Sequence, residues 1–521
     1  MSAPSNDMLK TLLLDHYHCT FFLPLLGFGK GLDPKADLKK IYPLNEKLNE
    51  ADAEAFYYFT PTLRDIVFDR GVPNESGLQA IQEWHLSTDT LTDTLKDWRL
   101  ELLPSKEQKE NAGEDVLKLA LVHQTVEFQT VRLYRYFNGI YMLAFTVRPH
   151  ATQHMYLEAW LRFTRLGRQL YPTFTEQWNE GKIAPLELTT PELAEPLRAL
   201  DAEVSRHFPK SSEYLSPILI HLAQQFFADD IKQKLKDEIR LFDDRMFVSV
   251  AYGLAGEEKL DENKRKRIKA LIATTDRFED TWSEMDGYAY SQTAIDRIIQ
   301  NTEFDFWADK GGHFIYNDMV NGYLYRDWFF NKIIAPKHIP YIYDRMLIQA
   351  LFYQASLRHY DHEITVTTKA LLNNKDKVND ISKQRGQFIE FTNQYWFREV
   401  TNQMQGKEIF RLQQQGLGLQ EHYTLLQDEI TRTDEYLQAL EADNAGKRAH
   451  QFTKLAAVLA MVAALPIFND IFKTEDSLWQ SIADSLANTG YLSVFCAKVS
   501  LAVLLASLLL ITAFYFWRKK D

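Results

Sequence analysis

The sequence predicts an α/β domain, then a long stalk helix, and then a C-terminal hairpin of two transmembrane helices. Three observations lead to this prediction: a strand hairpin with an Asn-Gly turn, a long stretch with helical periodicity, and nineteen uncharged residues at 499–517. The chain has 521 residues, of which 45% are hydrophobic and 25% charged. This composition excludes wholesale disorder and is enough for a large buried core.

Strand signals are concentrated in the first half of the chain. The segments Val126–Phe137 and Ile140–Val147 are rich in β-branched and aromatic residues, and the Asn138-Gly139 dipeptide between them favours a type I′ turn. Further predicted strands are Asp15–Leu23 and Met246–Gly253, and the predicted helices are 155–170 and 218–242. We therefore predict a cytoplasmic α/β domain over residues 1–284.

The middle of the chain has a different composition. Residues 285–380 are rich in aromatic residues and are predicted to be helical, with helices over Tyr323–Phe330 and Ile339–Tyr360. A long stalk helix is predicted over residues 381–454, and Gly416 and Gly418 are the positions at which it is expected to kink.

The C-terminal segments predict a membrane hairpin. A first transmembrane helix is expected at 455–472, an outer loop at 473–490, a second transmembrane helix at 491–517 and a basic tail at 518–521. Basic residues flank both helices and acidic residues fill the loop, which predicts cytoplasmic N- and C-termini in the inner cell membrane. The apolar run Leu455–Phe468 has only fourteen residues, so a buried amphipathic helix is the alternative.

An apolar seam follows the stalk. Leu419, Tyr423, Leu426, Ile430, Thr433, Leu437 and Leu440 alternate steps of four and three, as in a coiled coil. Continued at the same spacing, the seam gives the candidate pore-lining residues Asn444, Lys447, Gln451, Lys454, Val458, Met461, Leu465 and Phe468. Two lysines on a central axis would form a like-charge barrier to divalent cations, whereas a shift of one position would move them off it.

This organisation resembles the CorA family of two-span divalent-cation transporters, most closely over residues 451–521. The resemblance implies a homopentamer whose first membrane helices line a pore. The family's Gly-Met-Asn signature is absent, and the nearest tripeptide is Ile467-Phe468-Asn469. Asn469 and Asp470 are the candidate outer-mouth residues, with an ordinary helix end as the alternative.

The predicted function is that of an oligomeric ion channel or transporter, with Mg²⁺ as the transported or regulatory ion and a cytoplasmic domain that controls the pore. The missing signature favours an alternative, in which a membrane-anchored signalling or membrane-perturbing effector keeps this scaffold without cation transport. The expected partners are the lipid bilayer, further copies of the chain, and a cytoplasmic small molecule or metal ion. The acidic body, with a net charge of −12 for the chain, argues against nucleic acid.

Enzyme motifs are absent from the sequence, and no catalytic residue or required cofactor is predicted. Gly27–Gly31 contains a lysine but lacks the spacing of a phosphate loop. His16 and His18 would lie on one strand face, with Cys19 on the other, and are interpreted as structural histidines. His359, His362 and Glu363 lack the order of a metalloprotease motif, and a solvated helix end is expected there.

Overall fold

In the computed structural model the following residues are described: 12–26, 50–68, 80–87, 98–102, 123–170, 187–189, 217–227, 240–241, 245–256, 260–275, 290–373 and 378–473, with a few isolated positions. By contact clustering the chain divides into two compact units, residues 1–428 and 429–521.

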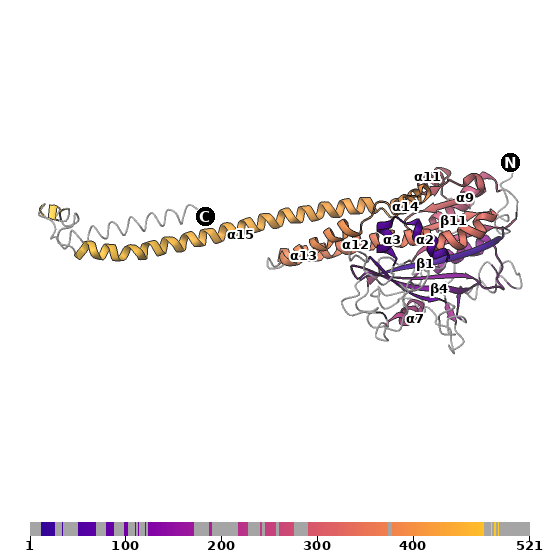
Figure 1. The fold of residues 1–521 in the computed structure, drawn as a ribbon, viewed down its shortest axis with the longest axis horizontal. Helices are drawn as coiled ribbons and strands as arrows, with labels where there is room; N and C mark the ends of the chain where they lie inside the picture. The colour runs from indigo at the N-terminus through magenta and orange to yellow at the C-terminus, as the bar shows by residue number, and fades with distance from the viewer. Residues whose placement is uncertain are drawn as a thin grey trace. The chain divides into compact units, whose positions relative to one another are not determined.

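The first unit is organised around one large sheet (Figure 1). Its eleven described strands are β1 (Leu14–Leu26), β2 (Ile81–Ser87), β3 (Arg99–Leu102), β4 (Gln124–Tyr136), β5 (Tyr141–Pro149), β6 (Glu187–Thr189), β7 (Arg240–Leu241), β8 (Phe247–Leu254), β9 (Glu303–Phe304), β10 (His313–Tyr316) and β11 (Val320–Tyr325). The order is β6-β3-β4-β5-β1-β8-β11-β10-β9, while β2 pairs with β4 and β7 with β1. The described pairs are antiparallel except β8–β11, which is parallel. The α/β sheet domain is thus confirmed.

The predicted hairpin is confirmed as β4 and β5. Gly139 in its turn has φ of +83°, a left-handed conformation that glycine adopts without steric cost. The predicted strands at 15–23 and 246–253 correspond to β1 and β8. β1 lies in the middle of the sheet, where it pairs with β5 on one side and β8 on the other. Its apolar residues from Tyr17 to Leu23 are buried.

One face of the sheet carries the main hydrophobic core. Helices α6 (Leu157–Gly167), α7 (Pro217–Phe226) and α9 (Glu262–Thr274) pack there. Trp160 and Phe163 of α6 are fully buried and pack against Tyr17 of β1, with Tyr17 and Trp160 ring centroids 4.6 Å apart. Side chains of this size contribute about 3–5 kcal/mol each when fully buried. Nearby α11 (Gln292–Thr302) packs on α9.

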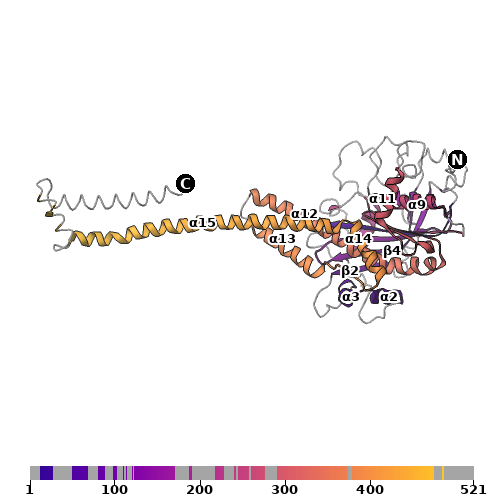
Figure 2. The same ribbon diagram turned by 90° about the horizontal axis from the view of Figure 1, so that it is seen from above.

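The opposite face is covered by the π-helix η5 (Phe330–Tyr343) and the long helix α12 (Asp344–Asn373). Tyr136 of β4 stacks on Phe352 of α12 with ring centroids 4.7 Å apart, and Gln349 Nε2 donates to the Tyr136 hydroxyl at 3.3 Å. Two short helices, α2 (Glu50–Tyr58) and α3 (Pro61–Val67), belong to this side as well, and α2 contacts η5. Figure 2 shows them near α14 (Met404–Gly416). The sheet therefore lies between two helical layers.

Two predictions about the middle of the chain differ from the structure. Residues 285–380 are not helical throughout, because β9, β10, β11 and the one-turn helix η4 (Ala308–Lys310) lie there. The predicted helix at Tyr323–Phe330 is the end of β11 followed by the start of η5. The residues of β11 are buried on both faces, so the strand has a continuous apolar and aromatic sequence that periodicity does not separate from a buried helix.

The predicted single stalk helix at 381–454 is interrupted. Its residues lie in α13 (Val378–Glu390), the π-turn η7 (Phe391–Tyr395), α14, and α15 (Leu419–Lys473). Gly418 has φ of +63° and separates α14 from α15, since a left-handed residue ends a helix. In the first unit Tyr423 of α15 stacks on Trp396, and Leu426 is buried.

The predicted transmembrane hairpin is contradicted. Within the part of the chain that the structure describes, no helix is both long and apolar enough to cross a membrane. Residues 455–472 form the C-terminal part of α15, and the apolar run Leu455–Phe468 is about 21 Å long as a helix, against about 30 Å of hydrocarbon. The segment 491–517 lies outside the described residues. The same finding contradicts the predicted membrane-channel description and the multi-pass inner-membrane location.

Candidate functional site

A cavity of about 680 Å³ lies on the η5 side of the sheet. Its floor is formed by β1, β4 and β5, and its wall by η5 and the first turn of α12. This volume is in the range of pockets that bind small organic molecules. The floor is the feature that distinguishes this face of the sheet, because the groups that the same three strands bury on their other face are mostly apolar and aromatic.

Strand alternation places polar side chains in the cavity. Successive side chains of a strand point to opposite faces, so His16, His18 and Thr20 face the cavity while Tyr17 and Cys19 face the core. The same alternation on the neighbouring strands brings in three polar residues from β4 and β5: Thr130, Arg132 and Thr146. The polar side chains of the floor thus follow from the alternation of polar and apolar residues along these strands.

Three threonines form a row across three strands. Thr146 of β5 is in register with Thr20 of β1 and with Thr130 of β4. The Thr146 hydroxyl lies 3.0 Å from the Thr20 hydroxyl, and it accepts from the Thr130 hydroxyl at 3.1 Å. The row presents hydroxyl groups, which can both donate and accept, to a molecule in the cavity.

Asp344 is a buried carboxyl group at the start of α12. It is 3% exposed and accepts a hydrogen bond from the Ser249 hydroxyl at 2.5 Å. Burial raises the pKa of Asp344 to about 7, although the hydrogen bonds from Ser249 and Thr20 and the positive charge of Arg132 oppose this rise. Near neutral pH this cavity residue therefore exists in both protonation states.

A buried ion-pair cluster supports the floor. The Glu83 carboxylate of β2 lies between two guanidinium groups, with Arg345 Nη2 at 3.0 Å and Arg132 Nη1 at 3.6 Å. Glu83 and Arg345 are almost fully buried, and the Arg345 guanidinium also lies 4.3 Å from the centre of the Phe68 ring. Buried charges need such partners, because an uncompensated charge there would be costly.

The two histidines of β1 are neutral. Their ring centroids are 5.2 Å apart, and His16 Nδ1 lies 2.6 Å from the Tyr325 hydroxyl. Burial lowers the pKa of His16 to about 4, and burial together with His16 lowers the pKa of His18 to about 3. The Nε2 atom of His18 is buried and has no hydrogen-bond partner in the structure. A buried polar atom without a partner in a cavity wall indicates a place for a ligand or for water.

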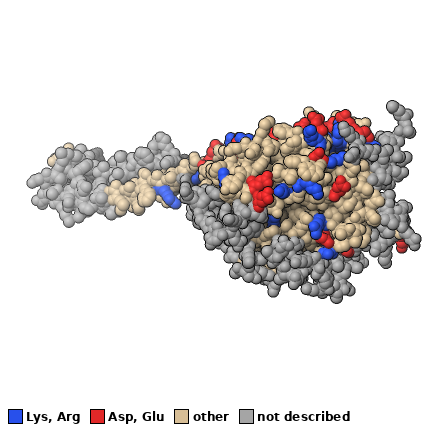
Figure 3. Space-filling model, turned by 45° about the vertical axis from the view of Figure 1, so that its right-hand side comes forward, with Lys and Arg blue, Asp and Glu red and all other residues tan. Residues whose placement is uncertain are grey.

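The cavity mouth has a second set of charges. Arg148 Nη2 lies 3.3 Å from the Glu127 carboxylate, and His150 Nε2 lies 3.6 Å from the same group. The Arg148 side chain is 58% exposed, so this pair is screened by water. On the charged surface in Figure 3, acidic and basic side chains are interspersed. Arg148 and Glu127 thus bring charges of both signs to this end of the cavity.

The wall has an unusual backbone. η5 is a π-helix of fourteen residues that contains Pro336 and Pro340, both of which line the cavity. Proline has no backbone N–H and disrupts regular α-helical bonding, which explains why this segment departs from α geometry. Irregular π segments occur often at functional sites.

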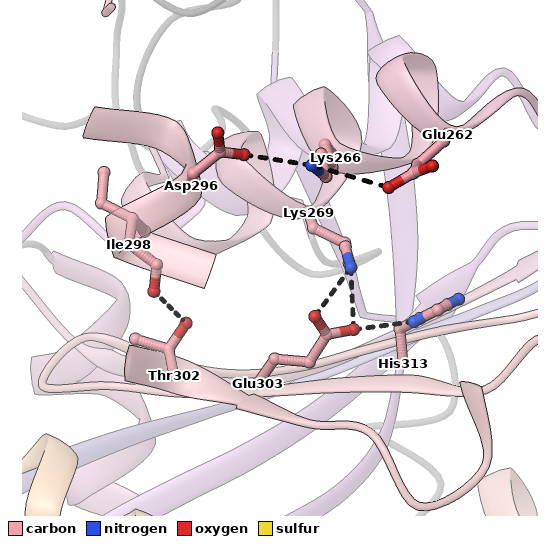
Figure 4. A network of polar contacts seen from close by, with 8 residues as sticks. All are labelled: Glu262, Lys266, Lys269, Asp296, Ile298, Thr302, Glu303 and His313. Carbon is pink, nitrogen blue, oxygen red and sulfur yellow. Dashed lines mark hydrogen bonds and ion pairs between the residues drawn. The ribbon is translucent and has the colours of Figure 1, made fainter. Parts of the chain in front are cut away.

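A second buried polar cluster lies away from the cavity (Figure 4). Lys269 Nζ donates to both oxygens of Glu303 at 2.8 and 2.7 Å, and His313 Nδ1 lies 2.7 Å from Glu303 Oε1. Although burial opposes it, the contacts with His313 and Lys269 hold the pKa of Glu303 below its usual value. These groups pair with one another and join α9 to β9 and β10, which is the arrangement of a structural cluster.

The predicted pore residues all belong to α15. Among those whose side chains are described, Lys447, Gln451, Lys454 and Val458 are exposed, and Asn444 and Met461 are partly exposed. Lys447 Nζ pairs with Asp443 one turn away at 2.7 Å. The side chains of Leu465, Phe468, Asn469 and Asp470 lie outside the described residues. Nothing in the structure tests their predicted role in a pore or mouth.

The other two candidate motifs, at 27–31 and at 359–363, do not contribute to the cavity among the described residues. Gly27–Gly31 lies outside the described residues. His359, His362 and Glu363 lie on α12, where Gln384 donates to the Glu363 carboxylate at 3.3 Å. In the described ranges no group of three or more His, Cys, Asp or Glu side chains is arranged to hold a metal ion.

Sequence reasoning missed the cavity residues. His16 and His18 were correctly predicted to share a strand face, but they were interpreted as structural. A signal was present, because β1 and β4 carry polar residues at alternate positions opposite an apolar series, and β5 does so at Thr146 and Arg148. Asp344 and the η5 wall have no such signal, since only the tertiary fold brings them to the strands.

Comparisons of the chain with protein-family models, with curated proteins and with solved structures gave no match. The resemblance to the CorA family therefore stays a prediction.

Proposed function

We propose that the sheet domain is a receptor for a small polar organic molecule, and that the chain signals the presence of this molecule through its helices. The observation that carries the proposal is the cavity of about 680 Å³, whose polar floor lies on strands that bury mostly apolar groups on their other face. Polar side chains buried at such a position cost folding free energy unless they are satisfied, so a ligand that hydrogen-bonds to them supplies a reason for their presence.

The lining suits an organic molecule better than a bare ion. Apolar groups from Phe22, Pro336, Pro340 and Ile348 lie around the polar floor. Binding sites for small organic molecules combine such apolar walls with a few well-placed polar groups.

The signalling part of the proposal rests on contacts that lead from the cavity wall to α15 within the first unit. Gln413 of α14 donates to the Tyr343 carbonyl at 3.1 Å, directly beside Asp344. Tyr353 of α12 stacks on Trp396, and Trp396 stacks on Tyr423 of α15, with ring centroids 4.7 and 5.1 Å apart. A ligand that contacts the start of α12 therefore acts on a helix that packs on these residues.

The first experiment identifies the molecule. Full-length protein is purified under mild conditions, denatured, and the released small molecules are measured by mass spectrometry; a metabolite library is screened by thermal shift in parallel. We expect one chemical class to raise the melting temperature. If no molecule is released and none of the library stabilises the protein, the receptor proposal is wrong.

A matched pair of variants places the bound molecule. Thr146→Val removes a hydroxyl from the cavity floor, and Thr164→Val removes a buried hydroxyl that bonds Tyr17 and Tyr252 on the core side. We expect Thr146→Val to weaken binding about fivefold, in line with about 1 kcal/mol for one hydrogen bond, and Thr164→Val to leave it unchanged. Equal effects would place the binding site elsewhere.

The signalling step is tested by hydrogen exchange with and without the molecule identified above. We expect slower exchange in η5, α12 and the first turns of α15. Protection confined to β1, β4 and β5 would retain the receptor and exclude the signalling route. The predicted transport of a divalent cation is a separate matter that no finding tests.

A further inference from the structure

The floor of the cavity has an excess of hydrogen-bond donors. Arg132 has five N–H donors, and the threonine row adds three hydroxyls. Among the contacts of Arg132, its Nη1 atom lies 3.6 Å from the Glu83 carboxylate and 3.4 Å from the Tyr134 hydroxyl. Two carboxylates of the described residues line the cavity: Asp15, which is exposed, and Asp344 of the wall, which already receives bonds from Ser249 and Thr20. A donor-rich floor favours a ligand that brings acceptors.

The charge balance at the floor depends on one proton. Arg132 and Arg345 are cationic, whereas Glu83 and Asp344 are acidic, so the cluster is neutral when both acids are ionised. Protonation of Asp344 leaves one positive charge beside the threonine row. In a buried site a single uncompensated charge strongly favours an ion of opposite sign.

We propose that the floor binds the anionic group of the ligand, a carboxylate or a phosphate, between Arg132, His18 and the threonine hydroxyls, and that Asp344 takes up a proton as the anion binds. This inference rests on the receptor function proposed above and names the chemical class of its ligand. His18 takes part through its Nε2 atom, which has no other partner and donates to the anion in the Nε2–H tautomer. The proton balance is one proton from solvent to the Asp344 carboxylate for each anion bound.

The other groups that face Asp344 do not titrate near neutral pH. Burial raises the pKa of Tyr323 on β11 well above its usual value, and it does the same for Cys19, which lies on the core face of β1 but interacts electrostatically with Asp344, so both are neutral. The pKa of His18 is lowered to about 3, so its ring is neutral as well. The remaining groups are Arg132, which stays cationic, and the hydroxyls of Thr20 and Ser249. Asp344 is therefore the residue that accepts the proton.

The test uses sulfate as a probe, because sulfate keeps its charge between pH 5.5 and 8.5. Its binding to the full-length protein is measured by calorimetry in buffers that differ in ionisation enthalpy. We expect the Kd to be nearly constant below pH 6 and to rise by up to tenfold per pH unit above pH 7. Proton uptake is expected to rise from near zero at pH 5.5 towards one per sulfate at pH 8.5.

Three variants separate the contributions. In Asp344→Asn we expect a Kd that does not change with pH and no proton uptake. Thr130→Val is expected to weaken sulfate binding about tenfold, while Lys266→Gln on α9, outside the cavity, changes the Kd less than threefold. The inference is overturned if sulfate does not bind at pH 6, if Thr130→Val binds it normally, or if proton uptake persists in Asp344→Asn.

The failure of this inference differs from the failure of the receptor function. A neutral molecule released from the purified protein, together with no sulfate binding, would retain the receptor and exclude the anion. Absence of any bound molecule would remove both.

Discussion

The two faces of the central sheet use the same three strands for opposite purposes. On one face β1, β4 and β5 bury Phe21, Val131 and Phe145 against α6 and its neighbours. On the other face the intervening residues are Thr20, Thr130 and Thr146, and they line a cavity. A single-residue step along a strand thus separates groups that hold the fold together from groups that can bind a ligand. Substitutions on one face should therefore change the stability of the domain, and substitutions on the other should change ligand binding.

The largest expected effect comes from the core face. Phe145 is 1% exposed and stacks on Phe21 with ring centroids 5.0 Å apart. We expect Phe145→Ala to lower the free energy of unfolding by about 3–5 kcal/mol, because it removes a buried ring and leaves a cavity. Chemical denaturation measures this change. An effect below about 1 kcal/mol would show that this face is not the core of the domain.

The next largest effect is a dependence of folding stability on pH that comes from Asp344 on the cavity side of the sheet. The raised pKa of Asp344 means that the folded protein holds this proton more tightly than the unfolded chain, whose carboxyl has a pKa near 4. The stability linked to this proton is present below pH 4 and is lost as the pH rises towards 7. A shift of about three pKa units corresponds to about 4 kcal/mol as an upper value.

We therefore expect Asp344→Asn to stabilise the protein at pH 8 by about 2–4 kcal/mol relative to its effect at pH 4, as measured by denaturation at both values. Asn keeps the size of the side chain but cannot ionise. Glu127→Gln, at the exposed mouth, is the control and should change the unfolding free energy by less than 1 kcal/mol. A pH-independent effect of Asp344→Asn would contradict the raised pKa.

For His16 and His18 we expect the opposite dependence of folding stability on pH. The pKa values of His16 and His18 are lowered to about 4 and 3, so their contribution to stability is present above about pH 6.5 and is lost as the pH falls towards 4. We expect His18→Gln to reduce the acid loss of stability between pH 6.5 and 4 by about 2–3 kcal/mol. Unfolding curves at half-unit pH steps measure it, and an unchanged slope would exclude His18 as a buried neutral residue.

The smallest expected effect is the loss of protein stability in the two threonine variants. Thr146→Val removes a half-buried hydroxyl and Thr164→Val a buried one, and each should lower the unfolding free energy by about 1 kcal/mol. Only the first should alter ligand binding. Similar stability with different binding would support the division between the two faces; a loss of more than 3 kcal/mol in Thr146→Val would assign this residue to the structural core.

Local sequence was sufficient where one strand or turn decides the structure. The Asn138-Gly139 turn and the apolar series of β1 and β8 predicted their elements correctly. β11 was predicted wrongly because a strand buried on both faces lacks alternation. The apolar run in α15 was predicted to cross a membrane, although Asn469 and Asp470 follow it after fourteen residues.

The candidate site needed more than local sequence. Its floor follows from alternation in three strands, but the register that aligns Thr20, Thr146 and Thr130 is set by pairing between distant segments. Asp344 and Tyr325 reach β1 from more than 300 residues along the chain, as the His16–Tyr325 contact shows. Such proximity is a property of the tertiary fold.

The central position of β1 also sets the order in which the chain can be assembled. β1, the earliest strand among the described residues, has to wait for both of its neighbours, β5 and then β8, which ends at Leu254. Contacts between such distant segments form slowly, and unpaired strand edges bind to other chains while they wait. Nascent chains that end before Phe247 are therefore expected to depend on chaperones, because their edge at β1 stays open until β8 has been synthesised.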